Sequence, residues 1–224
     1  MNILALDTAG AVLSLALSSG TEVWYFEMDG GLRHGELLMD GVDRLLAGAG
    51  MEPAGLECVA CMQGPGSFTG LRIGFAAAKG LALARGIPLV SVPTLDCMAL
   101  PPAAWPGLVL PAMDAKKGRF FTALYSNGVR ESDYLDAAPA EIAGMILGTE
   151  EPVLLSGPAA EQLRDSIGAL TGDRGRFFID PSGKRGKARE LLDIITKRGI
   201  LAQDAEAAPL YVRKSDAELT FETK

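Results

Sequence analysis

The sequence predicts an α/β protein built from two similar lobes, each with the element order βββαβαβ. The chain has 224 residues, of which 48% are hydrophobic, so it has room for one large domain or two small ones with extensive buried faces. Three short strands are followed by alternating helices and strands, which is typical of a mostly parallel sheet covered by helices. The same order then begins again in the second half of the chain.

In the first half, three apolar or alternating stretches joined by short turns predict an antiparallel meander. Apolar residues at helical spacing then predict two helices, which glycines and a proline bring to an end. The expected elements are strands Asn2–Leu6, Val12–Leu17 and Glu22–Glu27, helix Gly35–Ala47, strand Leu56–Met62, helix Leu71–Ala84 and strand Leu89–Val92.

The second half repeats this order after a proline-rich stretch at Pro101–Pro106, and a closing helix follows it. The expected elements are strands Leu108–Met113, Arg119–Tyr125 and Val129–Leu135, helix Ala138–Leu147, strand Val153–Leu155, helix Ala159–Leu170, strand Arg176–Ile179 and helix Lys187–Arg198. We therefore expect a first lobe at 1–100 and a second at 101–213, whose last helix packs back on the first lobe, and a flexible tail at 214–224.

The alignment of the two halves supports an internal duplication. Ile3–Asp7 and Leu110–Asp114 are both apolar runs that end in an aspartate, and each is followed by a four-residue turn and a strand. One offset aligns both features, as an ancient repeat would. Apolar strands ending in Asp also occur in unrelated α/β proteins, so the duplication is a hypothesis. It would place Asp7 and Asp114 across a cleft.

Composition excludes several classes of function. The 21 basic and 28 acidic residues give a net charge of −7, which disfavours a free-standing nucleic-acid binder. The single histidine, His34, leaves little for metal clusters or Ser/His and Cys/His nucleophiles, and we expect no metal site. Three cysteines and an amino terminus without a basic region indicate a cytoplasmic protein, and prolines interrupt the longest uncharged run, so we expect no membrane segment.

The strongest local motif is the glycine-rich stretch Gly64–Gly74, between a predicted strand and a predicted helix. Backbone N–H groups at such a helix start suit an anion, but the stretch matches neither the P-loop nor the dinucleotide-binding pattern. The alternative is a tight turn with Ser67 or Thr69 as the helix N-cap. If a nucleotide or another anion does bind, the residues expected to contact it are Asp7, Gly10, Ser67, Thr69, Asp114 and Lys116.

The helix after this loop carries small residues at helical spacing, which would let a second helix approach closely. Together with helix Gly35–Ala47 it is expected to form a flat apolar surface for a partner. The alternative is that both helices simply pack on their own sheet. The residues expected at the partner surface are Leu38, Met39, Val42, Leu46, Gly70, Gly74, Phe75, Ala77, Ala78 and Leu81.

The run Gly64–Gly74, followed by Ala78–Ala82, resembles the TsaB (YeaZ) family. Leu4–Thr8, Asp114–Gly118 and Pro209–Arg213 match in the same order. The glycine-rich block is the specific part of this resemblance, which extends over nearly the whole chain. It implies an actin-like (ribonuclease H-like) fold of two lobes, and a part in threonylcarbamoylation of adenosine in tRNA.

The resemblance also implies partners. The family's catalytic relative, TsaD, has a His-x-x-x-His metal pair where this chain has His34 followed by Leu38, so neither a transferase activity nor the old glycoprotease label carries over. The implied function is that of a non-catalytic subunit that binds TsaD, and then the ATPase TsaE, through its first two helices. Alone, the same surface is expected to form a homodimer, and tRNA contact is expected to be indirect.

The rival interpretation is an ATP-dependent phosphotransferase of the actin-like group, in which Asp7 and Asp114 hold Mg·ATP. The stretch Ala115–Gly118 lacks the second glycine-rich phosphate loop that this activity requires. No tightly held cofactor is therefore expected, and ATP or ADP is placed instead at the junction with the partner subunit.

Overall fold

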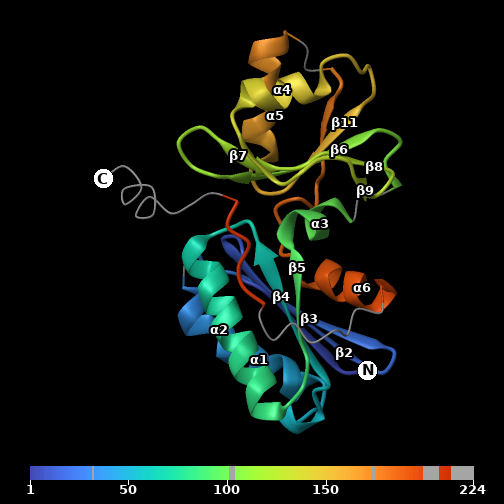
Figure 1. The fold of residues 1–224 in the computed structure, drawn as a ribbon. Coiled ribbons are helices and arrows are strands. Elements are labelled where there is room, and N and C mark those ends of the chain that lie inside the picture. The colour runs from blue at the N-terminus through green and yellow to red at the C-terminus, as the bar shows by residue number, and fades with distance from the viewer. Residues whose placement is uncertain (32, 101–103, 173–174, 199–206, 213–224) are drawn as a thin grey trace.

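The computed structural model describes residues 1–31, 33–100, 104–172, 175–198 and 207–212. Its first sheet has the strand order β3-β2-β1-β4-β5 (Figure 1). The first three strands pair antiparallel, and β4 and β5 continue the sheet in parallel. The strands are β1 (Ile3–Asp7), β2 (Val12–Ser19), β3 (Glu22–Asp29), β4 (Cys58–Gly64) and β5 (Leu89–Pro93).

The second sheet repeats this arrangement in the order β10-β7-β6-β11-β12, with the short strands β8 and β9 attached at β6. The strand directions also match those of the first sheet, because β6, β7 and β10 pair antiparallel while β11 and β12 follow in parallel. The duplicated α/β architecture is therefore confirmed at the level of topology. The strands are β6 (Leu108–Asp114), β7 (Phe120–Thr122), β8 (Tyr125–Ser126), β9 (Val129–Arg130), β10 (Leu135–Ala137), β11 (Val153–Ser156) and β12 (Phe177–Ile179).

Two predicted strands of the second half were wrong in extent. Arg119–Tyr125 divides into β7 and β8, and Val129–Leu135 divides into β9 and β10. The side chain of Ser132 causes part of the break, because its Oγ accepts the Leu124 N–H at 2.9 Å in place of a strand carbonyl. A tight turn with positive φ at Asn127 and Gly128 then folds β9 back on β8.

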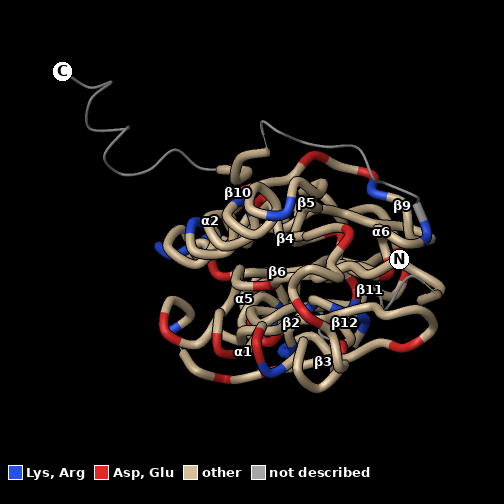
Figure 2. Tube along the Cα trace, turned by 90° about the horizontal axis from the view of Figure 1, so that it is seen from below, with Lys and Arg blue, Asp and Glu red and all other residues tan. Residues whose placement is uncertain are grey.

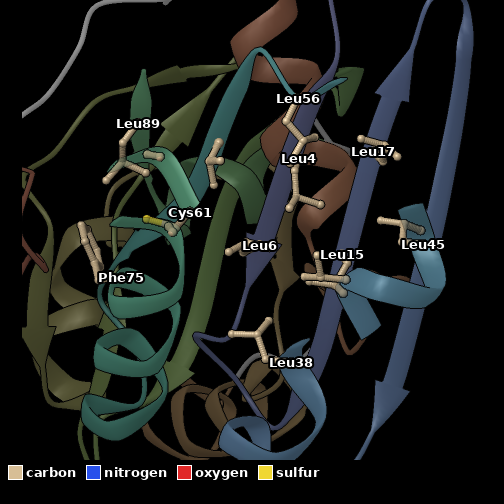
Figure 3. Close-up of a cluster of buried hydrophobic side chains, with 14 of the residues drawn as sticks. Leu4, Leu6, Leu15, Leu17, Leu38, Leu45, Leu56, Cys61, Phe75 and Leu89 are labelled. Atoms are coloured by element: carbon tan, nitrogen blue, oxygen red, sulfur yellow. The ribbon is translucent and has the colours of Figure 1, made fainter. Parts of the chain in front are cut away.

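Each sheet carries helices on both faces (Figure 1). On the first sheet, α1 (His34–Gly48) and α2 (Phe68–Arg85) cover one face. Figure 3 shows leucines of β1 and β2 meeting Leu38, Leu45 and Phe75 of these helices. Because side chains alternate along a strand, Ile3, Ala5 and Ala16 point to the opposite face, where α6 (Ala188–Arg198) packs. On the second sheet, α4 (Pro139–Ile146) and α5 (Ala160–Thr171) share a core with β6 and β11.

Two helices cross from one half of the chain to the other. The short helix α3 (Thr94–Ala99), absent from the sequence-based prediction, follows β5 yet packs with Val109 and Met113 of the second sheet. In return α6, from the end of the chain, packs on the first sheet. Asp96 of α3 also accepts hydrogen bonds from the hydroxyls of Tyr125 (2.6 Å) and Tyr134 (2.9 Å). These exchanged helices join the two halves.

The predicted helices correspond closely to α1 and α2, although α2 begins three residues earlier than expected. Ser67 is the N-cap of α2, and Gly86, in the left-handed region at φ 64°, ends it. In the described ranges all three cysteines are buried and reduced, and no helix is long and apolar enough to span a bilayer. Of the expected linker at Pro101–Pro106, residues 101–103 lie outside the described residues, and so does the expected tail at 214–224.

Candidate functional site

Asp7, at the end of β1, is buried and anchors a distant helix. Its Oδ2 accepts the Lys187 N–H at 2.7 Å, 180 residues away in sequence, and its Oδ1 accepts the Ala9 N–H at 3.0 Å. Burial raises the pKa of this carboxyl, although both hydrogen bonds act in the opposite direction. Ser14 completes the arrangement by accepting the Ala188 N–H at 3.1 Å. Asp7 and Ser14 thus bind the first N–H groups of α6.

A buried lysine lies beside this anchor. Lys187 is 1% exposed, and its ammonium group donates to the Ser182 carbonyl at 3.0 Å and lies 3.5 Å from Glu190. Burial also raises the pKa of Glu190, with the charge of Lys187 opposing the shift. These polar groups bind one another under α6, so the expected role of Asp7 as a nucleotide or magnesium ligand does not fit its surroundings.

The glycine-rich loop is docked against the β1–β2 turn. The Ser67 side chain accepts the Gly70 N–H at 3.2 Å, which is the N-cap alternative considered above. Its own N–H donates to the Ala9 carbonyl at 2.8 Å. Thr8 donates from Oγ1 to the Gly70 carbonyl at 2.7 Å. The groups that would hold an anion at Ser67 therefore hold the turn, while Thr69 is exposed.

Two glycines allow this contact. A Cβ on Gly70 would lie 2.1 Å from the Thr8 carbonyl oxygen, and one on Gly74 would lie 2.3 Å from Thr8 Oγ1. The expectation that these small residues face outward to a partner is therefore wrong. They face the chain's own β1–β2 turn, because only glycine lets the helix come so close.

Seven of the ten predicted partner-surface residues are buried inside the chain. The buried seven are Leu38, Val42, Leu46, Gly70, Gly74, Phe75 and Ala78. For these residues the alternative holds, since both helices need their full apolar faces to cover the sheet. Ala77 and Leu81 are half-buried, and Met39 is 44% exposed.

A cleft of about 680 Å³ lies between the two halves, and Gly10, Ser67, Asp114 and Lys116 line it. Asp114 accepts hydrogen bonds from the Lys116 N–H (2.7 Å) and ammonium (2.8 Å), and this lysine lowers the pKa of the carboxyl. Asp7 is absent from the lining. In the ranges described, no three His, Cys, Asp or Glu side chains cluster as metal ligands would.

His34, the single histidine, is buried at 1% exposure. Its Nε2 donates to the Gly10 carbonyl at 2.7 Å, which places the proton on that nitrogen because a carbonyl can only accept. Nδ1 is buried without a hydrogen-bond partner. His34 therefore joins the start of α1 to the β1–β2 turn.

One group of functional candidates was not predicted from the sequence as a group, although its residues lie in the stretches Gly64–Gly74 and Pro209–Arg213 that carry the family resemblance. Arg72 lies over the Phe68 ring, with its guanidinium carbon 3.7 Å from the ring centre, and donates from Nε to the Tyr211 hydroxyl at 3.2 Å. The Phe68 and Tyr211 rings are 5.3 Å apart. Phe68 and Tyr211 line the cleft, but they are so distant in sequence that no local pattern could connect them.

Comparison with known proteins identifies the family. A family model described as TsaD, tRNA N6-adenosine threonylcarbamoyltransferase, matches residues 30–165. The tRNA threonylcarbamoyladenosine biosynthesis protein TsaB of Bacillus subtilis is 30% identical over 97% of this chain and 96% of its own length. This chain belongs to the TsaB family. The TsaB of Escherichia coli is 37% identical over 61% of this chain and 62% of its own length.

Solved structures support the TsaB fold. YeaZ of Pseudomonas aeruginosa superimposes with a TM-score of 0.73 at 23% identity, covering 94% of this chain and all of that one (100%). A component of (R)-2-hydroxyglutaryl-CoA dehydratase from Acidaminococcus fermentans superimposes with a TM-score of 0.54 at 11% identity, covering 88% of this chain and 98% of that one. The expected two-lobed, actin-like fold class is therefore confirmed.

Proposed function

We propose that this chain is a non-catalytic subunit of the complex that makes threonylcarbamoyladenosine in tRNA, and that it binds and activates a TsaD-like transferase. The observation that supports the proposal is that Asp7 is buried and already hydrogen-bonded within the protein. Its carboxylate holds the start of α6 and is absent from the cleft lining. A chain whose nucleotide-site aspartate has a structural task is suited to assist a catalytic subunit. Membership of the TsaB family supplies the pathway.

The proposed partner surface is the solvent side of α1 and α2, where the side chains are exposed or half-buried. Leu83 is 86% exposed and Met39 is 44% exposed. A Cβ on Gly80 would meet no atom within 4 Å, so a partner helix can approach α2 closely there. The partner face comprises Met39, Ile73, Ala76, Ala77, Gly80 and Leu83.

The remaining parts of the proposal follow from the same face. A TsaE-like ATPase joins after the TsaD-like subunit, and ATP or ADP binds at the junction between subunits. In the absence of TsaD, two copies of this chain cover the face by forming a homodimer. Exposed apolar side chains on a helix are typical of such interfaces.

The test is capture of the TsaD-like subunit by the full chain and by charge variants of the partner face. Leu83→Glu and Met39→Glu bury an unpaired charge at the interface, and each should weaken binding at least tenfold. The matched control is Leu170→Glu, on α5 of the second half, where the side chain is 58% exposed. Equal binding by all variants would contradict the assigned face.

The alternative, an actin-like phosphotransferase, has one observation in its favour, which is the size of the cleft with Lys116 in its wall. Phosphate transfer also needs a magnesium ligand and donors for the phosphates. Asp7 and the Ser67 loop are bound elsewhere in the protein. Calorimetry with Mg·ATP separates the two functions, because the phosphotransferase must bind it in the isolated chain.

A further inference from the structure

Helix α2 has two chemically different edges. At about 3.6 residues per turn, Ile73, Ala77 and Ala84 share the edge toward α1, where a Cβ on Gly35 would contact Ile73 at 3.7 Å. Phe68, Arg72 and Lys79 share the opposite edge, where Phe68 and Arg72 contact Tyr211. The first edge is small and apolar and belongs to the partner face. The second is aromatic and basic.

The basic edge is locally cationic in an acidic protein. Helix α2 contains Arg72, Lys79 and Arg85 and no acidic residue, whereas the whole chain carries −7. Figure 2 marks the basic positions along α2 in blue. Lys116 and Lys117 line the adjoining cleft, although Asp114 pairs with Lys116. Charges beyond about 8 Å are largely screened at physiological salt. The positive charges near α2 therefore affect a ligand bound there more than the negative net charge of the whole chain does.

The aromatic rings beside these cations are accessible. Phe68 is 43% exposed and Tyr211 is 42% exposed. The guanidinium of Arg72 stacks on Phe68 while its Nε holds the Tyr211 hydroxyl, so the three side chains form one ordered platform. Exposed aromatic faces beside Arg and Lys are the combination that single-stranded nucleic acids use, with bases stacking on rings and phosphates meeting cations.

We propose that this platform and the cations beside it bind single-stranded nucleotides of the tRNA substrate directly. The RNA edge comprises Phe68, Arg72, Lys79, Lys116 and Tyr211. A base stacks on Phe68 and Tyr211 at the cleft mouth, and the flanking phosphates contact Arg72 and Lys79. The inference rests on the proposed part in tRNA modification, and it replaces the expectation that tRNA contact is only indirect.

The charges on helix α1 indicate from which side a polyanion can approach α2. It exposes Glu36, Asp40 and Asp43 against a single Arg44, so its side repels a phosphate backbone while the RNA edge attracts one. A polyanion therefore fits the edge of α2 that faces away from α1. This leaves the α1 side of the partner face free, around Met39, Ile73 and Ala77, so the TsaD-like subunit and the RNA can bind at the same time.

The experiment measures binding of a labelled, unmodified tRNA transcript to the full chain by fluorescence anisotropy at several salt concentrations. Arg72→Gln and Lys79→Gln should each weaken binding severalfold and reduce the salt dependence by about 0.7 per lost phosphate contact. Phe68→Ala should weaken binding roughly tenfold through lost stacking. Within the described ranges Lys79 makes no hydrogen bond or ion pair, so its variant tests charge without disturbing Tyr211. Arg164→Gln, on α5, is the matched control.

The same variants are then tested for capture of the TsaD-like subunit. The inference predicts that RNA-edge variants lose tRNA but keep the partner, and that Met39→Glu, on α1, does the reverse. Absence of tRNA binding at low salt, or an equal loss in Arg164→Gln, overturns the inference. Loss of the partner in the RNA-edge variants assigns this edge to protein instead. Failed partner capture with intact tRNA binding contradicts the proposed function alone.

Discussion

At the scale of single residues, the space around each glycine of α2 shows which side of the helix packs against the rest of the protein. Gly70 faces the Thr8 carbonyl, where a Cβ would lie 2.1 Å from the oxygen, whereas Gly80 faces open space. The spacing of small residues is the same for a helix that packs inward and for one that binds a partner. The sequence therefore revealed the stripe at Gly70 and Gly74 but not its direction, which depends on Thr8 from another element.

This difference predicts opposite effects for the same substitution. Gly70→Ala should lower the free energy of unfolding by about 2–4 kcal/mol, because a backbone carbonyl must move to admit the methyl group. Gly80→Ala should raise it by up to about 1 kcal/mol, since alanine favours the helix. Urea unfolding followed by circular dichroism measures both. Similar destabilisation by the two variants would contradict the inward packing of Gly70.

At the scale of elements, α6 depends on acceptors that its own segment does not contain, the Asp7 carboxylate and the Ser14 hydroxyl. The helix was predicted from its apolar spacing, and its buried Leu191 and Ile195 cover the first sheet as that spacing requires. Its anchor was not predictable, because Asp7 and Lys187 are 180 residues apart in sequence. For the same reason, Tyr211 and Phe68 could not be connected before the fold was known.

The environment of α6 predicts how stability varies with pH. Burial raises the pKa of Glu190 above 4.5, so the folded chain binds this proton more tightly than the unfolded chain does. The stabilisation is complete below pH 4.5 and is lost as the pH rises through the folded pKa. Glu190→Gln removes this dependence. From pH 4.5 upward, the free energy of unfolding of the variant should rise relative to that of the unsubstituted chain, by about 1.4 kcal/mol for each unit by which burial raises the pKa.

Urea unfolding at a series of pH values between 4 and 8 measures this difference. The control is Glu150→Gln, in an exposed loop, which should follow the unsubstituted chain at every pH. Parallel curves for Glu190→Gln and the control would show that the carboxyl under α6 titrates as it does in water.

At the scale of the whole molecule, the two halves share a topology but have exchanged helices and diverged in their loops. Alternation and helical spacing predicted the sheets and most helices, because those periods are local properties. The split strands depend on one hydrogen bond from the Leu124 N–H to the Ser132 side chain, which the periodicity of the sequence does not reveal. The crossing of α3 and the cleft depend on contacts between segments remote in sequence. The candidate site lies where these segments meet, so its composition followed only from the fold.

The most direct test of the central claim is a reconstituted modification assay. Threonylcarbamoyladenosine formed in a tRNA transcript is quantified for the TsaD-like and TsaE-like subunits, with and without this chain, and for this chain alone. The account predicts product only when the chain and the TsaD-like subunit are both present, with Leu83→Glu lowering the yield at limiting concentrations. Product from the chain alone, or an equal yield without it, would contradict its assignment as an activating, non-catalytic subunit.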